Sequence, residues 1–197
     1  METFFDRIIL LDKELFIWLN SFNNEFFDYV MFAISGKLIW IPLYILLLYF
    51  IFRTYKIQTI LVLVMVVLLV TLTDQISVLI KFYFHRLRPS HNPEFIDIVH
   101  VVNDYRGGAF GFISSHAANT FGFATLISLI LKNNFKYISI IFLWALIVSY
   151  SRIYLGVHYP LDIIGGIILG IISGYFIYII FLIFQSKFFI KIKQKLF

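Results

Sequence analysis

The sequence predicts an all-α protein, a polytopic membrane helix bundle with five spans. Hydrophobic residues make up 61% of the 197 residues and charged residues only 14%, against about half and about a quarter in ordinary soluble domains. Long apolar runs alternate with short charged turns. Cysteine is absent, which excludes a disulfide framework and a thiolate nucleophile. We interpret residues 1–197 as one membrane-embedded domain; a sixth span at the N-terminus is the alternative.

Residues 1–25 predict an amphipathic helix that lies in the membrane interface. Apolar residues recur at helical spacing, but charged residues interrupt them too often for a span. A cleavable signal peptide is not expected, because no small-residue cleavage site follows an uninterrupted apolar core. The interrupting residues are Asp6, Arg7, Asp12, Lys13 and Glu14.

Five apolar runs within residues 26–186 predict the spans: 38–52, 57–80, 116–131, 135–155 and 161–184. The first run is short for a bilayer that needs about 20 residues, so we extend it upstream through 29–34. Pro42 can kink this span. Asp74 lies inside the second span, where a carboxylate is a candidate for a functional site or for a buried pair with a base, and we interpret it as a structural partner. Residues 187–197 form a basic tail beside the headgroups.

Polar segments that are far apart in the sequence fall on one side of the predicted membrane. With five alternating spans, the end of the second, the start of the third, the end of the fourth and the start of the fifth share a face. These positions are 81–88, 114–116, Arg152 and 158–162. Four such segments on one face are not expected if each only anchored its own helix, so the sequence predicts a site there.

His158 and Asp162 form the centre of this predicted site. Pro160 is tolerated in the first turn of a helix, so the last helix begins near His158, and the two side chains lie four residues apart on one face. A carboxylate so placed accepts the proton of one ring nitrogen and leaves the other free for chemistry. The alternative is that Arg152 and Asp162 are interfacial anchors and His158 is a buried histidine.

The same face carries the ingredients of a phosphate site. Lys81, Arg88 and Arg152 supply three cations, and Ser114 and Ser115 supply hydroxyls at a helix N-terminus, where an anion is favoured. A bound divalent metal is not expected, because three cations would repel it. Nucleotide hydrolysis is not expected either, since the sequence has no phosphate-binding loop of the Gly-x4-Gly-Lys type.

Two imidazoles complete the predicted chemistry. His116 lies beside the predicted phosphate site and His158 beside its carboxylate; one neutral imidazole can attack phosphorus and form a phosphohistidine, while the second protonates the departing oxygen. The three cations would disperse the charge of the transition state, which is the main demand of phosphoryl transfer.

These residues resemble the three motifs of the type 2 phosphatidic acid phosphatase superfamily of membrane lipid phosphatases. Lys-x6-Arg-Pro spans 81–89, Pro-Ser-Gly-His stands as Ile113-Ser114-Ser115-His116, and Ser-Arg-x5-His-x3-Asp spans 151–162. The resemblance implies catalysis without metal or cofactor. It implies His158 as nucleophile, His116 as general acid, Asp162 as the residue that orients the nucleophile, and Lys81, Arg88, Ser114, Ser115 and Arg152 as the phosphate cradle. Ile113 and Ser115 depart from the pattern, and we expect these changes to affect headgroup preference.

The resemblance also implies a lipid phosphate as substrate, and we expect undecaprenyl diphosphate. Lipid A phosphate, phosphatidylglycerol phosphate and phosphatidate are alternatives, as is transfer of the phosphoryl group to another lipid. A channel or transporter is a remote alternative from another class. Membrane lipids are expected partners. Nucleic acid is not, because the basic residues flank apolar runs.

Charge counting predicts the orientation in the membrane. The face opposite the site carries eight basic residues, against five on the site face once Lys81, Arg88 and Arg152 are assigned to the site. The positive-inside rule then places the basic tail in the cytoplasm. The site then faces outward, and because the resemblance implies bacterial lipid substrates, we expect a protein of the bacterial inner membrane whose site faces the periplasm.

Overall fold

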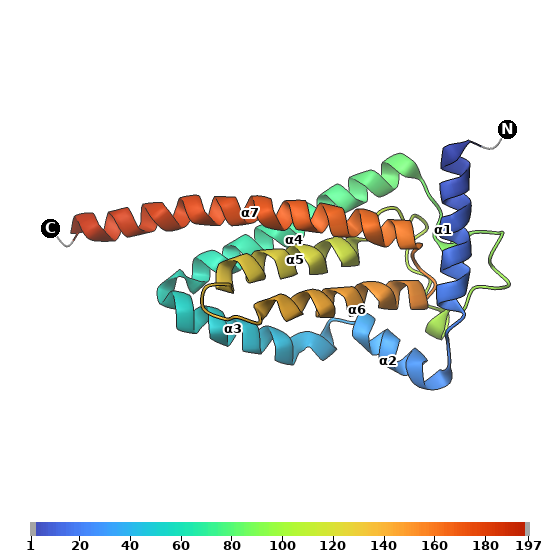
Figure 1. The fold of residues 1–197 in the computed structure, drawn as a ribbon, viewed down its shortest axis with the longest axis horizontal. Coiled ribbons are helices and arrows are strands. Elements are labelled where there is room, and N and C mark those ends of the chain that lie inside the picture. Colours follow the sequence, from blue (N-terminus) through green and yellow to red (C-terminus); the bar gives the residue numbers. More distant parts are fainter. Residues whose placement is uncertain (1–2, 196–197) are drawn as a thin grey trace.

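The structure, a computed structural model, describes the backbone of residues 3–195 and the side chains of residues 3–186. Over these residues the chain is all-helical, as predicted, and contains no strand (Figure 1). The α-helices are α1 (Phe4–Asn20), α2 (Glu25–Ser35), α3 (Ile41–Tyr55), α4 (Thr59–Phe84), α5 (Ser115–Leu131), α6 (Ile141–Tyr154) and α7 (Pro160–Lys195). Short 3-10 helices cover Leu38–Trp40, Lys56–Gln58, Pro89–His91, Val102–Asp104 and Ile138–Ile140. The predicted basic tail, residues 187–197, lies outside the residues whose side chains are described.

Helix α5 lies at the centre of the bundle, between α4, α6 and α7. Its contact with α7 is close because glycines face it: a Cβ on Gly170 would lie 2.4 Å from the carbonyl oxygen of Ala118, and one on Gly174 would lie 2.6 Å from that of Gly122. Small residues at helix contacts are typical of membrane bundles. The result is that the start of α5 is held firmly against the start of α7.

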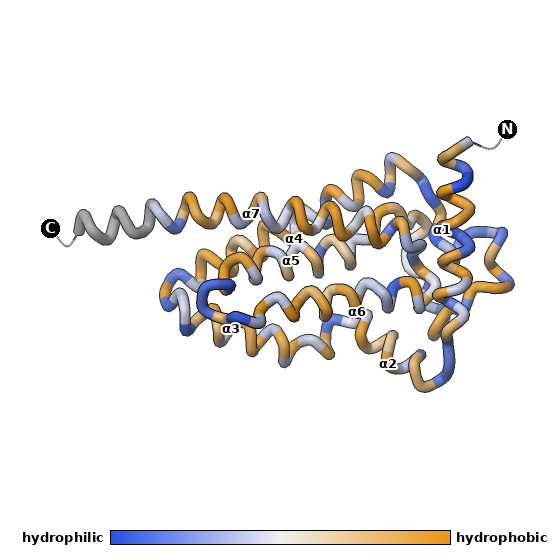
Figure 2. Tube along the Cα trace, in the orientation of Figure 1, coloured by the Kyte–Doolittle hydropathy of each residue, from blue (hydrophilic) through white to orange (hydrophobic). Residues whose placement is uncertain are grey.

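Apolar residues dominate the length of the bundle, and polar residues gather at its two ends (Figure 2). Two described stretches are long and apolar enough to cross a membrane, Leu38–Phe84, which contains α3 and α4, and Pro160–Ser186 of α7. Ser115–Leu131 and Ile138–Tyr154 are shorter apolar helices. The number of five spans, α3 to α7, stays a prediction.

Two expectations about the first span were wrong. The segment 29–34 does not extend it, because it belongs to a separate helix, α2, which ends at Ser35 before Gly36. Pro42 does not kink it, because Pro42 is the second residue of α3. A proline in the first turn removes an N–H that has no partner within the helix, so it favours the helix start.

Helix α1 crosses the end of the bundle at which α4 ends and α7 begins (Figure 1). Its inward face carries Asp12, Phe16 and Asn20, which are buried and spaced four residues apart. Leu15 and Trp18 are exposed on the outside. An apolar outer face suits the predicted place in the membrane interface. The polar inner face, which was not predicted, contacts the site end of the protein.

Candidate active site

The four predicted polar segments meet at the end of the bundle that α1 covers. Lys81 lies in the last turn of α4, Ser115 begins α5, and Arg152 lies in the last turn of α6. Asp162 lies in the first turn of α7, and Arg88 comes from the long loop between α4 and α5. The convergence predicted from the alternation of spans is therefore present in the structure.

His158 and Asp162 are buried and face each other as predicted. His158 is 1% exposed and Asp162 is 0% exposed. His158 Nδ1 lies 3.3 Å from Asp162 Oδ2, and the N–H of Tyr159 donates to the same oxygen at 3.0 Å. An Nδ1 proton donated to this carboxylate leaves the lone pair of Nε2 free.

The surroundings of His158 keep its imidazole neutral. Burial is the main cause that lowers the pKa of His158 well below its usual range, and the positive charges of Arg88, Arg152 and Lys81 add to it. A neutral ring is the form that can act as a nucleophile. The three cations thus lie close enough to His158 for their charges to act on it.

Two buried guanidinium groups have donors to spare. Arg88 donates from Nε to the carbonyl of Phe110 at 3.1 Å, and Arg152 donates to the hydroxyls of Ser35 and Tyr105. Arg88 Nη1 and Arg152 Nε are buried and have no hydrogen-bond partner among the described residues. Burial, and then the charge of Arg152, lowers the pKa of Arg88. Buried donors without partners and two cations that repel each other both favour a bound anion.

The remaining predicted phosphate ligands, Lys81, Ser114 and Ser115, make hydrogen bonds within the protein. Lys81 Nζ donates a hydrogen bond to the hydroxyl of Ser115. Ser115 stands where the family motif has glycine, and its extra hydroxyl thus holds Lys81, a predicted phosphate ligand. Ser114 caps α5 by accepting the N–H of Ala117, and its own N–H donates to the backbone oxygen of Asp162 at 2.9 Å. Its hydroxyl proton is the donor that Ser114 can still offer to an anion.

His116 lies at the wall between two cavities. It shares a cavity of about 170 Å³ with Arg152 and Tyr105, and it lines a second cavity of about 370 Å³ with Ser115 and Asp74. Arg152, one of the predicted phosphate ligands, therefore lies across the smaller cavity from His116. This position suits a residue that protonates a departing oxygen.

Sequence reasoning missed two residues: Arg86, which holds Asp162, and Asp12, which holds Arg86. Arg86 donates from Nη1 to Asp162 Oδ1 at 2.8 Å and from Nη2 to Asp12 Oδ2 at 2.5 Å. Asp12 Oδ1 accepts the N–H of Leu161 at 2.8 Å. Arg86 stands two residues before Arg88 in the first motif, which was a weak signal; Asp12 gave none, because it lies 149 positions from Leu161.

Comparison with known proteins identifies a family and several relatives of this chain. A family model described as the PAP2 superfamily matches residues 59–185. The chain is 40% identical over 174 residues to a lipid A 4'-phosphatase of Bacteroides thetaiotaomicron, which covers 86% of this chain and 76% of the relative. It is 40% identical over 184 residues to a lipid A 4'-phosphatase of Porphyromonas gingivalis, with 92% and 78% covered.

Two further proteins are similar. An undecaprenyl-diphosphatase of Sulfolobus acidocaldarius is 33% identical over 160 residues, which cover 79% of this chain and 64% of that protein. The crystal structure of Aquifex aeolicus LpxE matches the fold with a TM-score of 0.64 and 26% identity, and covers 85% of this chain and 94% of that one.

Proposed function

The chain belongs to the PAP2 superfamily and is a membrane phosphatase, as its three motifs predicted, and we propose that it removes phosphate from a phosphorylated lipid. The reaction takes place at the periplasmic face of the bacterial inner membrane, in a bundle of five spans with α1 in the interface. His158 is the nucleophile, His116 the general acid and Asp162 the residue that orients His158.

The observation that carries this proposal is the pair of buried guanidinium donors beside a neutral histidine. Arg88 Nη1 and Arg152 Nε lack partners, and the charges of both residues act on His158. A phosphate supplies acceptor oxygens to both donors and negative charge to both cations. Lys81, Ser114 and Ser115 complete the cradle for the remaining oxygens.

The first half-reaction transfers the phosphoryl group to the enzyme. The lone pair of His158 Nε2 forms a bond to phosphorus while the bond from phosphorus to the lipid oxygen breaks. His116 gives its proton to that oxygen, and the lipid leaves as an alcohol. Asp162 accepts the Nδ1 hydrogen bond and stabilises the positive charge that develops on the ring.

The second half-reaction returns the enzyme to its initial state. A water molecule gives a proton to His116, which is now neutral, and its oxygen bonds to phosphorus as the bond from phosphorus to Nε2 breaks. Inorganic phosphate leaves. Arg88, Arg152 and Lys81 stabilise the charge on the phosphoryl oxygens in both transition states, which is the role that a metal ion has in many other phosphatases.

The relatives support lipid A phosphate as the substrate to test first. The two lipid A 4'-phosphatases are 40% identical and each match more than four fifths of this chain, whereas the undecaprenyl-diphosphatase is 33% identical. This order favours lipid A over the undecaprenyl diphosphate predicted from the sequence. Undecaprenyl diphosphate stays the second candidate, because a relative with that activity also covers most of the chain.

A phosphate-release panel tests the proposal. Purified wild type and His158→Ala are incubated in detergent with lipid A, undecaprenyl diphosphate, phosphatidylglycerol phosphate and phosphatidate, and free phosphate is measured. Wild type should release phosphate from lipid A fastest, and His158→Ala should release none while it keeps the wild-type apparent melting temperature. Failure of wild type on all four lipids, or equal rates for the two proteins, would overturn the proposal.

A further inference from the structure

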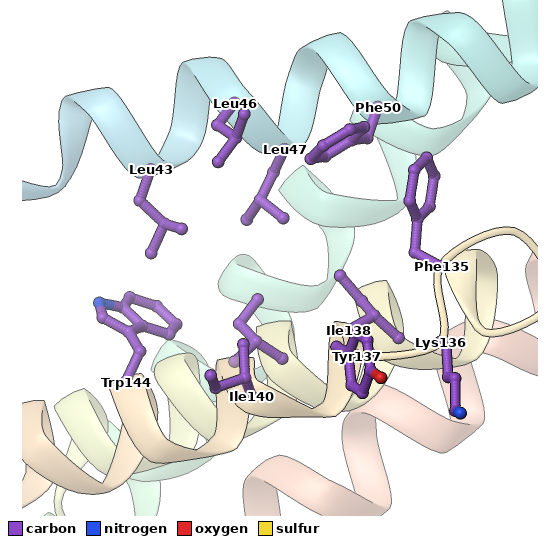
Figure 3. A pocket seen from close by; sticks show the side chains of 11 residues that line it. Leu43, Leu46, Leu47, Phe50, Phe135, Lys136, Tyr137, Ile138, Ile140 and Trp144 are labelled. Atoms are coloured by element: carbon purple, nitrogen blue, oxygen red, sulfur yellow. The ribbon is translucent and has the colours of Figure 1, made fainter.

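A groove of about 330 Å³ opens near the end of the bundle that lies opposite the candidate site. One wall is α3, and the other is formed by residues 135–144, which include the start of α6. Figure 3 shows Leu43 of α3 across from Trp144 of α6, and Phe50 of α3 beside Phe135 of the turn between α5 and α6. None of the candidate site residues lines this groove, so the proposed reaction gives it no role.

The dimensions of the groove suit one hydrocarbon chain. Leu43 and Phe50 are seven residues apart, which is about 10 Å along α3, against about 15 Å of hydrocarbon in one leaflet of a bilayer. The rings of Phe50 and Phe135 close one end, with centroids 4.3 Å apart. Leu46 and Ile140, one on each wall, are 49% and 71% exposed. The groove is therefore open along its side to the apolar outer surface of the bundle.

The walls of the groove differ from those of the cavity beside His116. In that cavity Asp74 Oδ1 accepts the amide of Asn119 at 2.9 Å, so Asp74 has a structural partner, as expected. The residues that line the groove are aliphatic or aromatic except Lys136. A polar headgroup inside the groove would lose its hydrogen bonds to water, whereas a hydrocarbon chain would lose none. The groove thus suits the chain of a lipid and leaves its headgroup outside.

Basic residues flank the closed end of the groove. Arg53 follows Phe50 by three residues, so it lies one turn further along the same face of α3. Lys136 follows Phe135 directly and lines the groove. Four exposed bases lie at this end of the bundle, in the turns between α3 and α4 and between α5 and α6 or beside them: Arg53, Lys56, Lys132 and Lys136.

The protein does not neutralise this positive charge within the part of the chain that the structure describes. None of the four bases makes an ion pair with a described residue. Residues 29–73 and 105–161, which include both walls of the groove, contain no acidic residue. Bases at the surface of a bilayer attract anionic lipids. A ligand of this region should therefore carry negative charge beside its hydrocarbon chain.

We propose that the groove binds one acyl chain of an anionic phospholipid, whose phosphate lies outside the closed end and contacts Arg53 and Lys136. Such a lipid supplies in one molecule the hydrocarbon that the walls favour and the charge that the bases favour. A zwitterionic lipid supplies the chain without the net charge. In the proposed orientation the lipid comes from the cytoplasmic leaflet. It is held and not hydrolysed, because His158 and the phosphate cradle lie at the other end of the bundle.

Photo-crosslinking of the wild-type protein tests the proposal. The protein is reconstituted in phosphatidylcholine liposomes that contain a small fraction of either phosphatidylglycerol or phosphatidylcholine with a diazirine in one acyl chain. After illumination, labelled peptides are mapped, and label in residues 43–50 and 135–144 is divided by label in residues 60–68, an outer part of α4. This ratio should be at least tenfold higher for phosphatidylglycerol, because two bases each contribute about fivefold. Equal ratios for the two lipids, or no label in the groove, overturn the proposal.

Charge variants test the place of the phosphate. Arg53→Gln and Lys136→Gln should each lower the phosphatidylglycerol ratio about fivefold. Arg7→Gln removes an exposed base on α1, at the other end of the bundle, and should keep the wild-type ratio. A wild-type ratio in both Arg53→Gln and Lys136→Gln overturns the assignment of the phosphate to these residues.

A variant that fills the groove tests the place of the chain. Leu46→Trp puts a larger side chain on the groove wall and should lower the phosphatidylglycerol label there to the level found on α4. Leu48→Trp is the matched control, because Leu48 is an exposed residue of α3 that does not line the groove. Groove label that survives Leu46→Trp undiminished overturns the proposal.

Discussion

Asp12→Asn should slow the enzyme although Asp12 lies on the interfacial helix α1. Asp12 is 4% exposed and accepts hydrogen bonds from Arg86 and from the N–H of Leu161. Arg86 reaches from Asp12 to Asp162, whose other carboxylate oxygen faces His158. Asp12 is therefore a positioning residue: it holds the guanidinium that holds the carboxylate that orients the nucleophile.

The magnitude follows from the charge that is removed. An asparagine keeps the shape of Asp12 but replaces a carboxylate with a neutral amide, and a hydrogen bond to a charged group contributes about 1.5–3 kcal/mol. A loss of about 2 kcal/mol in the transition state lowers kcat about thirtyfold. The same loss in the folded state lowers the apparent melting temperature by about 4–8 °C for a chain of this length.

Steady-state kinetics on a lipid phosphate and thermal unfolding in detergent measure both effects. KM should stay within about twofold of wild type, because Asp12 lies outside the phosphate cradle. Glu14→Gln is the matched control, since Glu14 is an exposed acid on the same helix. The reasoning is refuted if Asp12→Asn equals Glu14→Gln in kcat and in melting temperature, or if only KM changes.

Three further predictions concern charge, metals and orientation. Arg88→Gln removes a positive charge that lowers the pKa of His158, so that pKa should rise. In a pH profile of kcat/KM, the fall on the acid side should then begin at a higher pH than in wild type. An acid limb at the wild-type pH contradicts this prediction. EDTA should leave phosphate release unchanged, because three basic side chains carry the charge stabilisation, and loss of activity restored by a divalent ion would refute it. Because the chain lacks cysteine, Gly108→Cys should react with a membrane-impermeant maleimide added outside spheroplasts, whereas Asn133→Cys should react only after lysis; the reverse pattern would invert the orientation.

Much of the site could be predicted because its residues obey local rules. Pro160 in a first helical turn places His158 and Asp162 on one face, and Ser114 caps α5 as expected of a serine before an apolar run. The alternation of spans then brings Arg152 to the same end of the bundle. The residues at these positions belong to the three sequence motifs, and the match to the PAP2 family model over residues 59–185 confirms the family resemblance.

The missed contacts join elements whose packing has no local pattern. Ser35 and Tyr105 hold Arg152 from α2 and from the long loop, and Asp12 reaches Arg86 from α1. Helix periodicity showed that α1 is amphipathic, but it did not show that its polar face is the one turned inward.

Trapping of the covalent intermediate tests the central claim, that His158 carries the phosphoryl group, most directly. Wild type is mixed with lipid A radiolabelled in its phosphate, quenched in alkali during turnover, digested and mapped. The label should be stable in alkali, labile in acid and confined to the peptide that contains His158, and it should be absent from His158→Ala. A label on another residue, or no label while phosphate is being released, would contradict the account.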